Sequence, residues 1–147
     1  MAILSVDRIQ LGATAVHKSD AIRQAGQLLV GSGCVLPAYV DGMLAREETM
    51  STYLGNGVSI PHGQFDNRAD ILQTGISVLQ LPEGVEWEDG EKAYLVIGIA
   101  ASSDEHVGVL ANLAEVIEDE EMTLALIQTT DPTLILNHLG AARAEME

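Results

Sequence analysis

An unbroken apolar run in the second half of the chain restricts the possible fold more than any other feature. The run Tyr94-Leu95-Val96-Ile97-Gly98-Ile99-Ala100-Ala101 contains no charged residue. A run of this kind predicts a central strand that is covered on both faces. Ser102-Ser103-Asp104-Glu105 follows at once, and hydroxyl caps followed by acids are typical of a helix N-terminus. The two segments together predict a strand–helix unit.

Two other segments have the composition of strands. Val58–Ile60 is short and apolar, and 75–81 alternates and has the composition of a β-strand. Pro82-Glu83-Gly84 is expected to end the second of these strands. The acidic stretch from Glu83 to Glu91 is expected to be a loop or the tip of a hairpin, in which Trp87 covers the edge of the core.

Helical spacing of apolar residues accounts for much of the rest. The first helix is expected to be capped by Ser19 or Asp20 and to be ended by Gly31 and Gly33. Pro37 can open a second helix, which places Arg46 in its last turn. Two further helices are expected over 120–128 and 132–145.

These elements predict an α/β fold with a mixed parallel/antiparallel central sheet of about five strands, sandwiched between helical layers. The chain has 147 residues. Because this length is typical of one domain, residues 1–147 are expected to form a single domain.

Seven basic residues against 22 acidic ones give a formal charge of −15. This charge argues against binding to nucleic acid and to anionic membrane surfaces, and it favours a basic protein partner. The N-terminus lacks the pattern of a signal peptide, and the apolar run is too short for direct membrane insertion. The single cysteine, Cys34, lies in an apolar setting and is expected to be a buried thiol. A cytoplasmic location is therefore expected.

One histidine stands out by its setting. The stretch Tyr53-Leu54-Gly55-Asn56-Gly57-Val58-Ser59-Ile60-Pro61-His62-Gly63 presents His62 between a proline and a glycine. Pro61 fixes its own φ and restricts Ile60 to extended geometry, while Gly63 is expected to leave room for a partner or a phosphate. His62 is therefore expected to be exposed and oriented, as a nucleophile or as a ligand.

Two other residues are candidates for the same site. His106 follows the strongest strand and lies in the first turn of the next helix, where backbone N–H groups favour an anion. Arg46 is a candidate as well, although Glu47 and Glu48 also allow an ordinary surface ion pair. His17 and His138 are expected to have surface or helix-flank roles.

Two competing types of site find less support. His62 and His106 are two candidate metal ligands, but the chain has no closely spaced histidine pair and no cysteine cluster. A Ser-His-Asp hydrolase is not supported either, since there is no GxSxG motif. Neither a metal nor a cofactor is implied.

The chain resembles the mannitol/fructose class of enzyme IIA domains of the bacterial phosphoenolpyruvate-dependent sugar phosphotransferase system, and most closely the mannitol-specific members. Tyr53–Gly55 and Ile60–Gly63 resemble the phosphorylation-site motif of that family. Met43–Glu47, Leu81–Val85 and Leu95–His106 extend the resemblance over essentially the whole chain. Ser59 departs from the family pattern, which usually has alanine there, and the change is expected to affect local packing.

The resemblance implies a phosphoryl relay in sugar uptake. His62 would accept a phosphoryl group from the phosphocarrier protein HPr and pass it to a cysteine of enzyme IIB of a mannitol-type permease. His106 and Arg46 would stabilise the charge of the transferring group. The alternative is a regulatory phosphotransferase-system module, in which the phosphorylation state of His62 controls a partner protein. A free-standing enzyme IIA is expected rather than a fragment of a fused permease.

Overall fold

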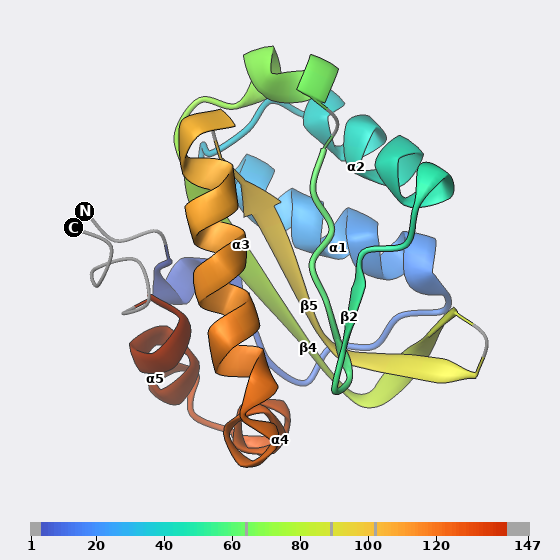
Figure 1. The fold of residues 1–147 in the computed structure, drawn as a ribbon, viewed down its shortest axis with the longest axis vertical. Coiled ribbons are helices and arrows are strands. Elements are labelled where there is room, and N and C mark those ends of the chain that lie inside the picture. The colour runs from blue at the N-terminus through green and yellow to red at the C-terminus, as the bar shows by residue number, and fades with distance from the viewer. Residues whose placement is uncertain (1–3, 64, 89, 102, 141–147) are drawn as a thin grey trace.

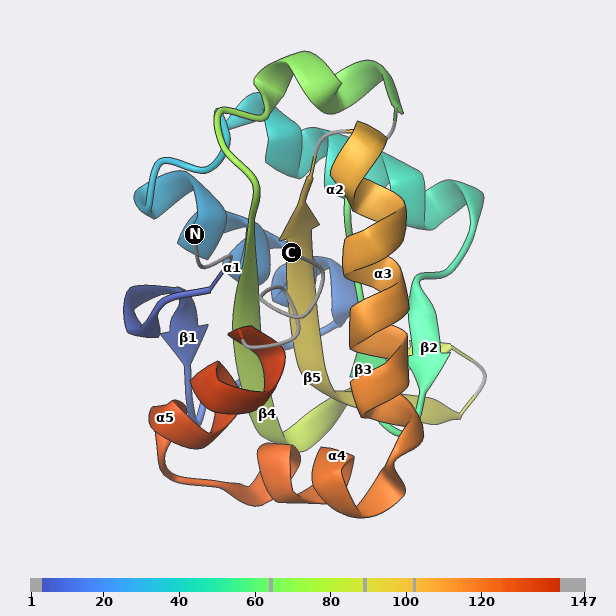
Figure 2. The same cartoon turned by 60° about the vertical axis from the view of Figure 1, so that its left-hand side comes forward.

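The computed structural model describes residues 4–63, 65–88, 90–101 and 103–140. Its centre is a five-stranded sheet in the order β1-β4-β5-β3-β2, with helices on both faces (Figures 1 and 2). β1–β4 and β3–β5 are parallel pairs, whereas β4–β5 and β2–β3 are antiparallel. The predicted α/β class, with a mixed sheet of about five strands between helical layers, is confirmed.

The strands are β1 (Ile9–Gln10), β2 (Tyr53–Gly55), β3 (Val58–Ser59), β4 (Gly75–Glu88) and β5 (Glu91–Ala100). The helices are α1 (Lys18–Gly31), α2 (Ala38–Thr49), α3 (Ser103–Glu118), α4 (Glu120–Gln128) and α5 (Pro132–Ile135). Shorter helical turns are η1 (Val6–Arg8), η2 (Phe65–Asp70) and η3 (Leu136–Gly140).

The strand β5 is the centre of the core, as its apolar sequence predicts. Leu95, Ile97 and Ile99 belong to the apolar cluster that α3, α4 and α5 cover. Val96 and Ala100 belong to the cluster on the other face, against α1 and α2. Because side chains alternate along a strand, an apolar residue at every position is what two buried faces require.

The strand β4 is longer than expected. It continues through Pro82 to Glu88 and pairs with β5 over most of its length, so the predicted break at Pro82-Glu83-Gly84 is wrong. The pairing register shifts between Gln80 and Val85, and Gly84 has a φ of +74°. Residues 81–84 of β4 lie opposite Tyr94 alone, and this irregularity accommodates the proline and the glycine without ending the strand.

The start of α1 also differs from the expectation. His17, not Ser19 or Asp20, is the N-cap residue, and its Nδ1 accepts a hydrogen bond from the backbone N–H of Asp20 at 3.2 Å. A neutral imidazole nitrogen can cap a helix as a side-chain oxygen does. The predicted helix-flank role of His17 is therefore confirmed.

The C-terminal helices follow the prediction closely as far as they are described. α4 covers Glu120–Gln128, as expected. The helix expected over 132–145 begins at Pro132 but changes at Leu136 to a π-helical turn, and residues 141–147 lie outside the described part. Ser102 of the predicted cap before α3 also lies outside it. Within the described ranges, no helix combines the length and apolar character needed to cross a membrane.

Candidate functional site

His62 lies where the short strand β3 leads to the edge of the sheet. Its main chain forms a parallel bridge with Ile99, near the carboxyl end of β5. The N–H of Ile99 donates a hydrogen bond to the carbonyl of Pro61 at 2.9 Å. His62 is half-buried, so the expectation of an exposed histidine is wrong. The carboxyl ends of parallel strands, here β3 and β5, are where ligands commonly bind in α/β sheets, which agrees with the predicted role of His62 as a site residue.

The His62 ring is oriented by its own main chain. Nδ1 lies 2.9 Å from the carbonyl oxygen of Ile60. A carbonyl only accepts hydrogen bonds, so the proton of the neutral ring is on Nδ1. The lone pair of the neutral ring is consequently on Nε2, which is the nitrogen able to act as a nucleophile.

The residue after His62 has a different role from the one expected. A Cβ on Gly63 would lie 2.6 Å from Cε1 of Tyr39, so the space at Gly63 is taken by that ring. The expectation that this space admits a partner or a phosphate is therefore wrong. The N–H of Gly63 donates to the Tyr39 hydroxyl at 2.9 Å, and that hydroxyl donates to the carbonyl of Ile99 at 2.8 Å.

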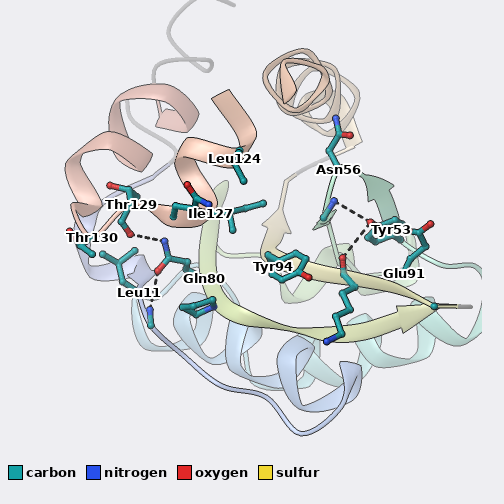
Figure 3. A pocket seen from close by; sticks show the side chains of 16 residues that line it. Leu11, Tyr53, Asn56, Gln80, Glu91, Tyr94, Leu124, Ile127, Thr129 and Thr130 are labelled. Carbon is teal, nitrogen blue, oxygen red and sulfur yellow. Dashed lines mark hydrogen bonds between the residues drawn. The ribbon is translucent and has the colours of Figure 1, made fainter. Parts of the chain in front are cut away.

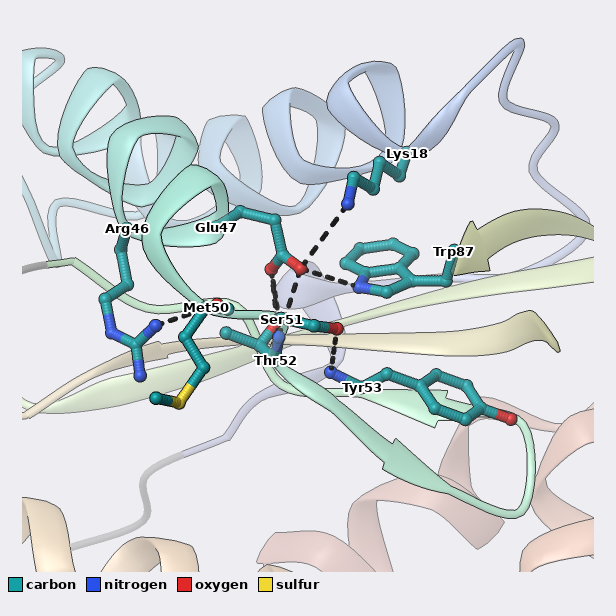
Figure 4. Close-up of polar contacts among 8 residues, drawn as sticks. All are labelled: Lys18, Arg46, Glu47, Met50, Ser51, Thr52, Tyr53 and Trp87. Carbon is teal, nitrogen blue, oxygen red and sulfur yellow. Dashed lines mark hydrogen bonds and ion pairs between the residues drawn. The ribbon is translucent and has the colours of Figure 1, made fainter. Parts of the chain in front are cut away.

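Arg46 lies in the last turn of α2, as predicted. It is half-buried, and its Nη1 donates to the carbonyl of Met50 at 2.8 Å (Figure 4). The chain then continues to Thr52, whose carbonyl accepts a hydrogen bond from the N–H of Ile60 at 3.0 Å. The Arg46 guanidinium is thus bonded to a segment that pairs with the strand entering His62.

Glu47 is buried, so it does not form the surface ion pair considered for Arg46. Figure 4 shows its carboxylate among Thr52, Trp87 and Lys18. It accepts from the N–H of Thr52 and from Nε1 of Trp87, each at 3.0 Å, and lies 3.9 Å from Nζ of Lys18. It also accepts from the Thr52 hydroxyl.

The contacts of Glu47 join the end of α2 to Thr52, the residue before β2, and to Trp87 of β4. Sequence reasoning missed this residue, although a signal was present. Glu47 is four residues after Met43 and seven after Val40, and these spacings place it on the inner stripe of the helix.

The main chain of His106 belongs to a third element, which begins near the end of β5. His106 is the fourth residue of α3, which begins three residues after β5 ends. Its main chain therefore lies in the first turn of a helix that starts near the partner of His62, as the sequence predicts. The side chain of His106 lies outside the described part of the structure.

The metal alternative paired His62 with His106, whose side chain lies outside the described part of the structure. No group of three or more His, Cys, Asp or Glu side chains within the described ranges is arranged to hold an ion. Cys34 is fully buried, as expected for a structural thiol.

A groove of about 1190 Å³ lies at the opposite end of the sheet from His62. Its residues include Tyr53 and Asn56 on one side and Gln80 and Ile127 on the other (Figure 3). The Tyr53 hydroxyl accepts a hydrogen bond from the N–H of Gly57 at 3.1 Å. Burial raises the pKa of Tyr53 above its ordinary value, and this hydrogen bond opposes the rise. The groove contains neither His62 nor Arg46.

Fold and site together define a small α/β domain that presents an oriented histidine at the carboxyl end of the parallel strands β3 and β5 in a mixed sheet. Comparison with known proteins places this domain in a family. Residues 2–141 match the family described as phosphoenolpyruvate-dependent sugar phosphotransferase system, EIIA 2. The chain belongs to this family.

Individual relatives agree with the family match. The multiphosphoryl transfer protein of Escherichia coli O157:H7 is 52% identical over 127 residues, which are 86% of this chain and 34% of that protein. The mannitol-specific phosphotransferase enzyme IIA component of Bacillus subtilis (strain 168) is 42% identical over 127 residues, 86% of this chain and 89% of that protein.

A solved structure has the same fold. Enzyme IIA of the Escherichia coli mannitol system, in complex with phosphorylated enzyme IIB, matches with a TM-score of 0.88 and 39% identity, over 94% of this chain and 97% of that one. The chain spans about a third of the length of the Escherichia coli multiphosphoryl transfer protein.

Proposed function

We propose that this chain is a single enzyme IIA domain that relays a phosphoryl group during sugar uptake. His62 accepts the group from HPr and passes it to a cysteine of enzyme IIB of a mannitol-type permease. The hydrogen bond between His62 Nδ1 and the Ile60 carbonyl carries the proposal, because it leaves the lone pair on Nε2. The mannitol-specific relative and the structure solved with phosphorylated IIB support the choice of partner.

The proposed relay has two displacement steps. In the first, Nε2 of His62 attacks phosphorus, the new P–N bond forms, and the bond from phosphorus to HPr breaks. In the second, the thiolate of the IIB cysteine attacks, and the P–N bond breaks with its electron pair returning to Nε2. If Nδ1 keeps its proton through the hydrogen bond to the Ile60 carbonyl, the ring carries a positive charge while Nε2 is bonded to phosphorus. The ring returns to the neutral Nδ1–H form when the P–N bond breaks.

The transferring group carries negative charge on its equatorial oxygens, and positioned donors lower the barrier. Arg46 can supply a planar fork of N–H donors from the end of α2. His106, in the first turn of α3, can donate a hydrogen bond where the backbone N–H groups also favour an anion. The proposed chemistry uses these groups and no cofactor.

A cytoplasmic location is proposed from the cysteine content and the net charge of the chain. The single cysteine is a buried thiol, which suits a reducing compartment. The surplus of acidic residues, with a formal charge of −15, suits encounter with a basic protein partner.

The test is a reconstituted phosphoryl transfer. The protein is incubated with labelled phosphoenolpyruvate, with HPr and with enzyme I, which phosphorylates HPr. One acid-labile phosphoryl group is expected per chain. His62→Ala should abolish labelling, whereas His138→Ala should label normally. Labelling of His62→Ala to the wild-type extent would refute the assignment of His62.

A second stage distinguishes transport from regulation. Purified mannitol enzyme IIB is added to the phosphorylated protein. Transfer of the label to IIB supports the relay. Retention of the label on His62 would contradict the relay and favour the regulatory module, whose phosphorylation state controls a partner protein.

A further inference from the structure

The hydroxyl of Tyr39 lies at the junction of three chain segments. Tyr39 is the second residue of α2, and it is 3% exposed. Its hydroxyl accepts a hydrogen bond from the N–H of Gly63 at 2.9 Å and donates one to the carbonyl of Ile99 at 2.8 Å. One side-chain oxygen therefore joins α2, the residue after His62 and the end of β5.

These two hydrogen bonds complete the attachment of His62 to the sheet. In a parallel bridge between His62 and Ile99, one rung joins the Ile99 N–H to the Pro61 carbonyl, and this bond is present at 2.9 Å. The other rung would join the Gly63 N–H to the Ile99 carbonyl. The Tyr39 hydroxyl bonds to both of these groups, so it bridges the second rung.

Each segment that meets at this hydroxyl leads to one candidate site residue. Arg46 lies seven residues after Tyr39, about two turns along the same side of α2. Gly63 is bonded directly to His62. Ile99 precedes the start of α3 by four residues, and His106 lies in the first turn of that helix. Movement at Tyr39 would therefore change the spacing among all three.

The local packing fits the bridging hydroxyl closely. Because a Cβ at Gly63 would lie 2.6 Å from the Tyr39 ring, glycine is required for the main chain to approach the phenol. Burial raises the pKa of Tyr39 above its ordinary value of 10.0, and the Gly63 hydrogen bond opposes the rise. The phenol therefore keeps its proton at neutral pH and serves as donor and acceptor at once.

We infer that Tyr39 is a positioning residue for phosphoryl transfer, which holds the His62 main chain against the end of β5 so that Nε2 stays in line with the incoming phosphorus. The inference rests on the proposed function of His62. In-line displacement requires close alignment, and a misplacement of about 1 Å can cost about 100-fold in rate. Tyr39 acts through His62 and does not itself touch the phosphoryl group.

The test compares Tyr39→Phe with Tyr53→Phe. Both changes remove one hydroxyl and keep the ring, and both hydroxyls accept a backbone N–H, from Gly63 and from Gly57 respectively. Tyr53 lines the groove at the opposite end of the sheet from His62, so it is a matched control. Transfer from phospho-HPr is measured well below the melting temperature of each variant.

Tyr39→Phe is expected to lower kcat about tenfold with little change in KM. The docking surface for HPr is unaltered, whereas the alignment of Nε2 with the incoming phosphorus is lost. Hydrogen exchange of the Gly63 amide should accelerate at least tenfold, with amides elsewhere in β5 unchanged. Tyr53→Phe should alter neither kcat nor Gly63 exchange. Unchanged kcat in Tyr39→Phe, or a loss confined to KM, would overturn the inference.

Gly63→Ala tests the same contact from the other side. The added methyl group displaces the Tyr39 ring and should lower kcat in the same direction. A folded Gly63→Ala protein with wild-type kcat would also contradict the inference. Failure of the proposed function has a separate signature, since His62→Ala would then still accept the label from phospho-HPr, whatever the behaviour of Tyr39→Phe.

Discussion

Nδ1 of His62 lies 2.9 Å from the carbonyl oxygen of Ile60, two residues earlier in the chain. This contact assigns the ring proton to Nδ1, since a carbonyl cannot donate. We predict that the neutral ring is the Nδ1–H tautomer and that the phosphoryl group is carried by Nε2. Nitrogen-15 NMR of the ring before and after phosphorylation measures both. A phosphoryl group on Nδ1 would contradict the prediction, because that nitrogen would first have to leave the Ile60 carbonyl.

Arg46→Lys is predicted to slow phosphoryl transfer. Lysine keeps the charge but loses the planar fork of donors, and removal of one such donor in other enzymes costs about 10²–10³ in rate. We expect kcat for transfer from phospho-HPr to fall at least tenfold. The matched control is Arg23→Lys, a change at an exposed position on α1. Equal rates for the two variants would show that Arg46 does not act in phosphoryl transfer.

Glu47→Ala is predicted to destabilise the fold. The change leaves the Thr52 N–H and the Trp87 Nε1–H without their acceptor. Each unsatisfied buried donor costs about 1–3 kcal/mol, so we expect a loss of about 3 kcal/mol in the free energy of unfolding. Urea denaturation measures it, and the fluorescence of Trp87, the single tryptophan in the chain, reports the local change.

The control for Glu47 is its neighbour. Glu48 is exposed on the same helical turn, and Glu48→Ala should change the unfolding free energy by no more than about 0.5 kcal/mol. Similar losses for the two variants would show that helix propensity, rather than the buried carboxylate, accounts for the effect.

Ser59→Ala is predicted to be neutral or stabilising, by up to about 1 kcal/mol. The Ser59 side chain is fully buried in β3, and its hydroxyl has no hydrogen-bond partner among the described residues. Removing a buried hydroxyl without a partner removes an uncompensated desolvation cost. Thermal or urea unfolding measures the change.

Ser77 provides the comparison for Ser59. It is equally buried in β4, but its hydroxyl donates to the carbonyl of Ala25 in α1 at 2.8 Å. Ser77→Ala should therefore cost about 1 kcal/mol. If Ser59→Ala destabilises as much as Ser77→Ala, the Ser59 hydroxyl makes a contact that the structure does not account for.

Alkaline pH is predicted to destabilise the protein through Tyr39. Its pKa in the folded state is raised above the ordinary value of 10.0, chiefly by burial. Above pH 10 the unfolded chain releases the phenolic proton while the folded chain keeps it, so the unfolded state binds fewer protons and stability falls as pH rises. The contribution is complete below pH 10 and is lost as pH rises through the folded pKa. Tyr39→Phe should flatten the decline, which urea unfolding between pH 9 and 11 measures. An equal decline in the variant would contradict the assignment.

Much of the fold follows from local sequence. The apolar run of β5 predicts a buried central strand because both of its faces must be covered, and apolar periodicity predicts α4 at its observed bounds. Pro82 and Gly84 were misleading, since a bulge allows β4 to continue past them. β1 and β2 are two and three residues long, too short for any periodicity to indicate them.

The features of the candidate site also separate into those that local sequence indicates and those that depend on packing. Local sequence was enough to place His62 between a proline and a glycine after a strand, Arg46 in the last turn of one helix and His106 in the first turn of another. The packed structure was needed to show that the Ile60 carbonyl assigns the ring tautomer, that Tyr39 occupies the space beside Gly63, and that Glu47 is buried. Local sequence specifies backbone propensity and the periodicity of apolar side chains, because these depend on neighbours along the chain. Hydrogen bonds such as that of Tyr39 to Ile99, 60 residues apart, depend on which segments the packed sheet brings together.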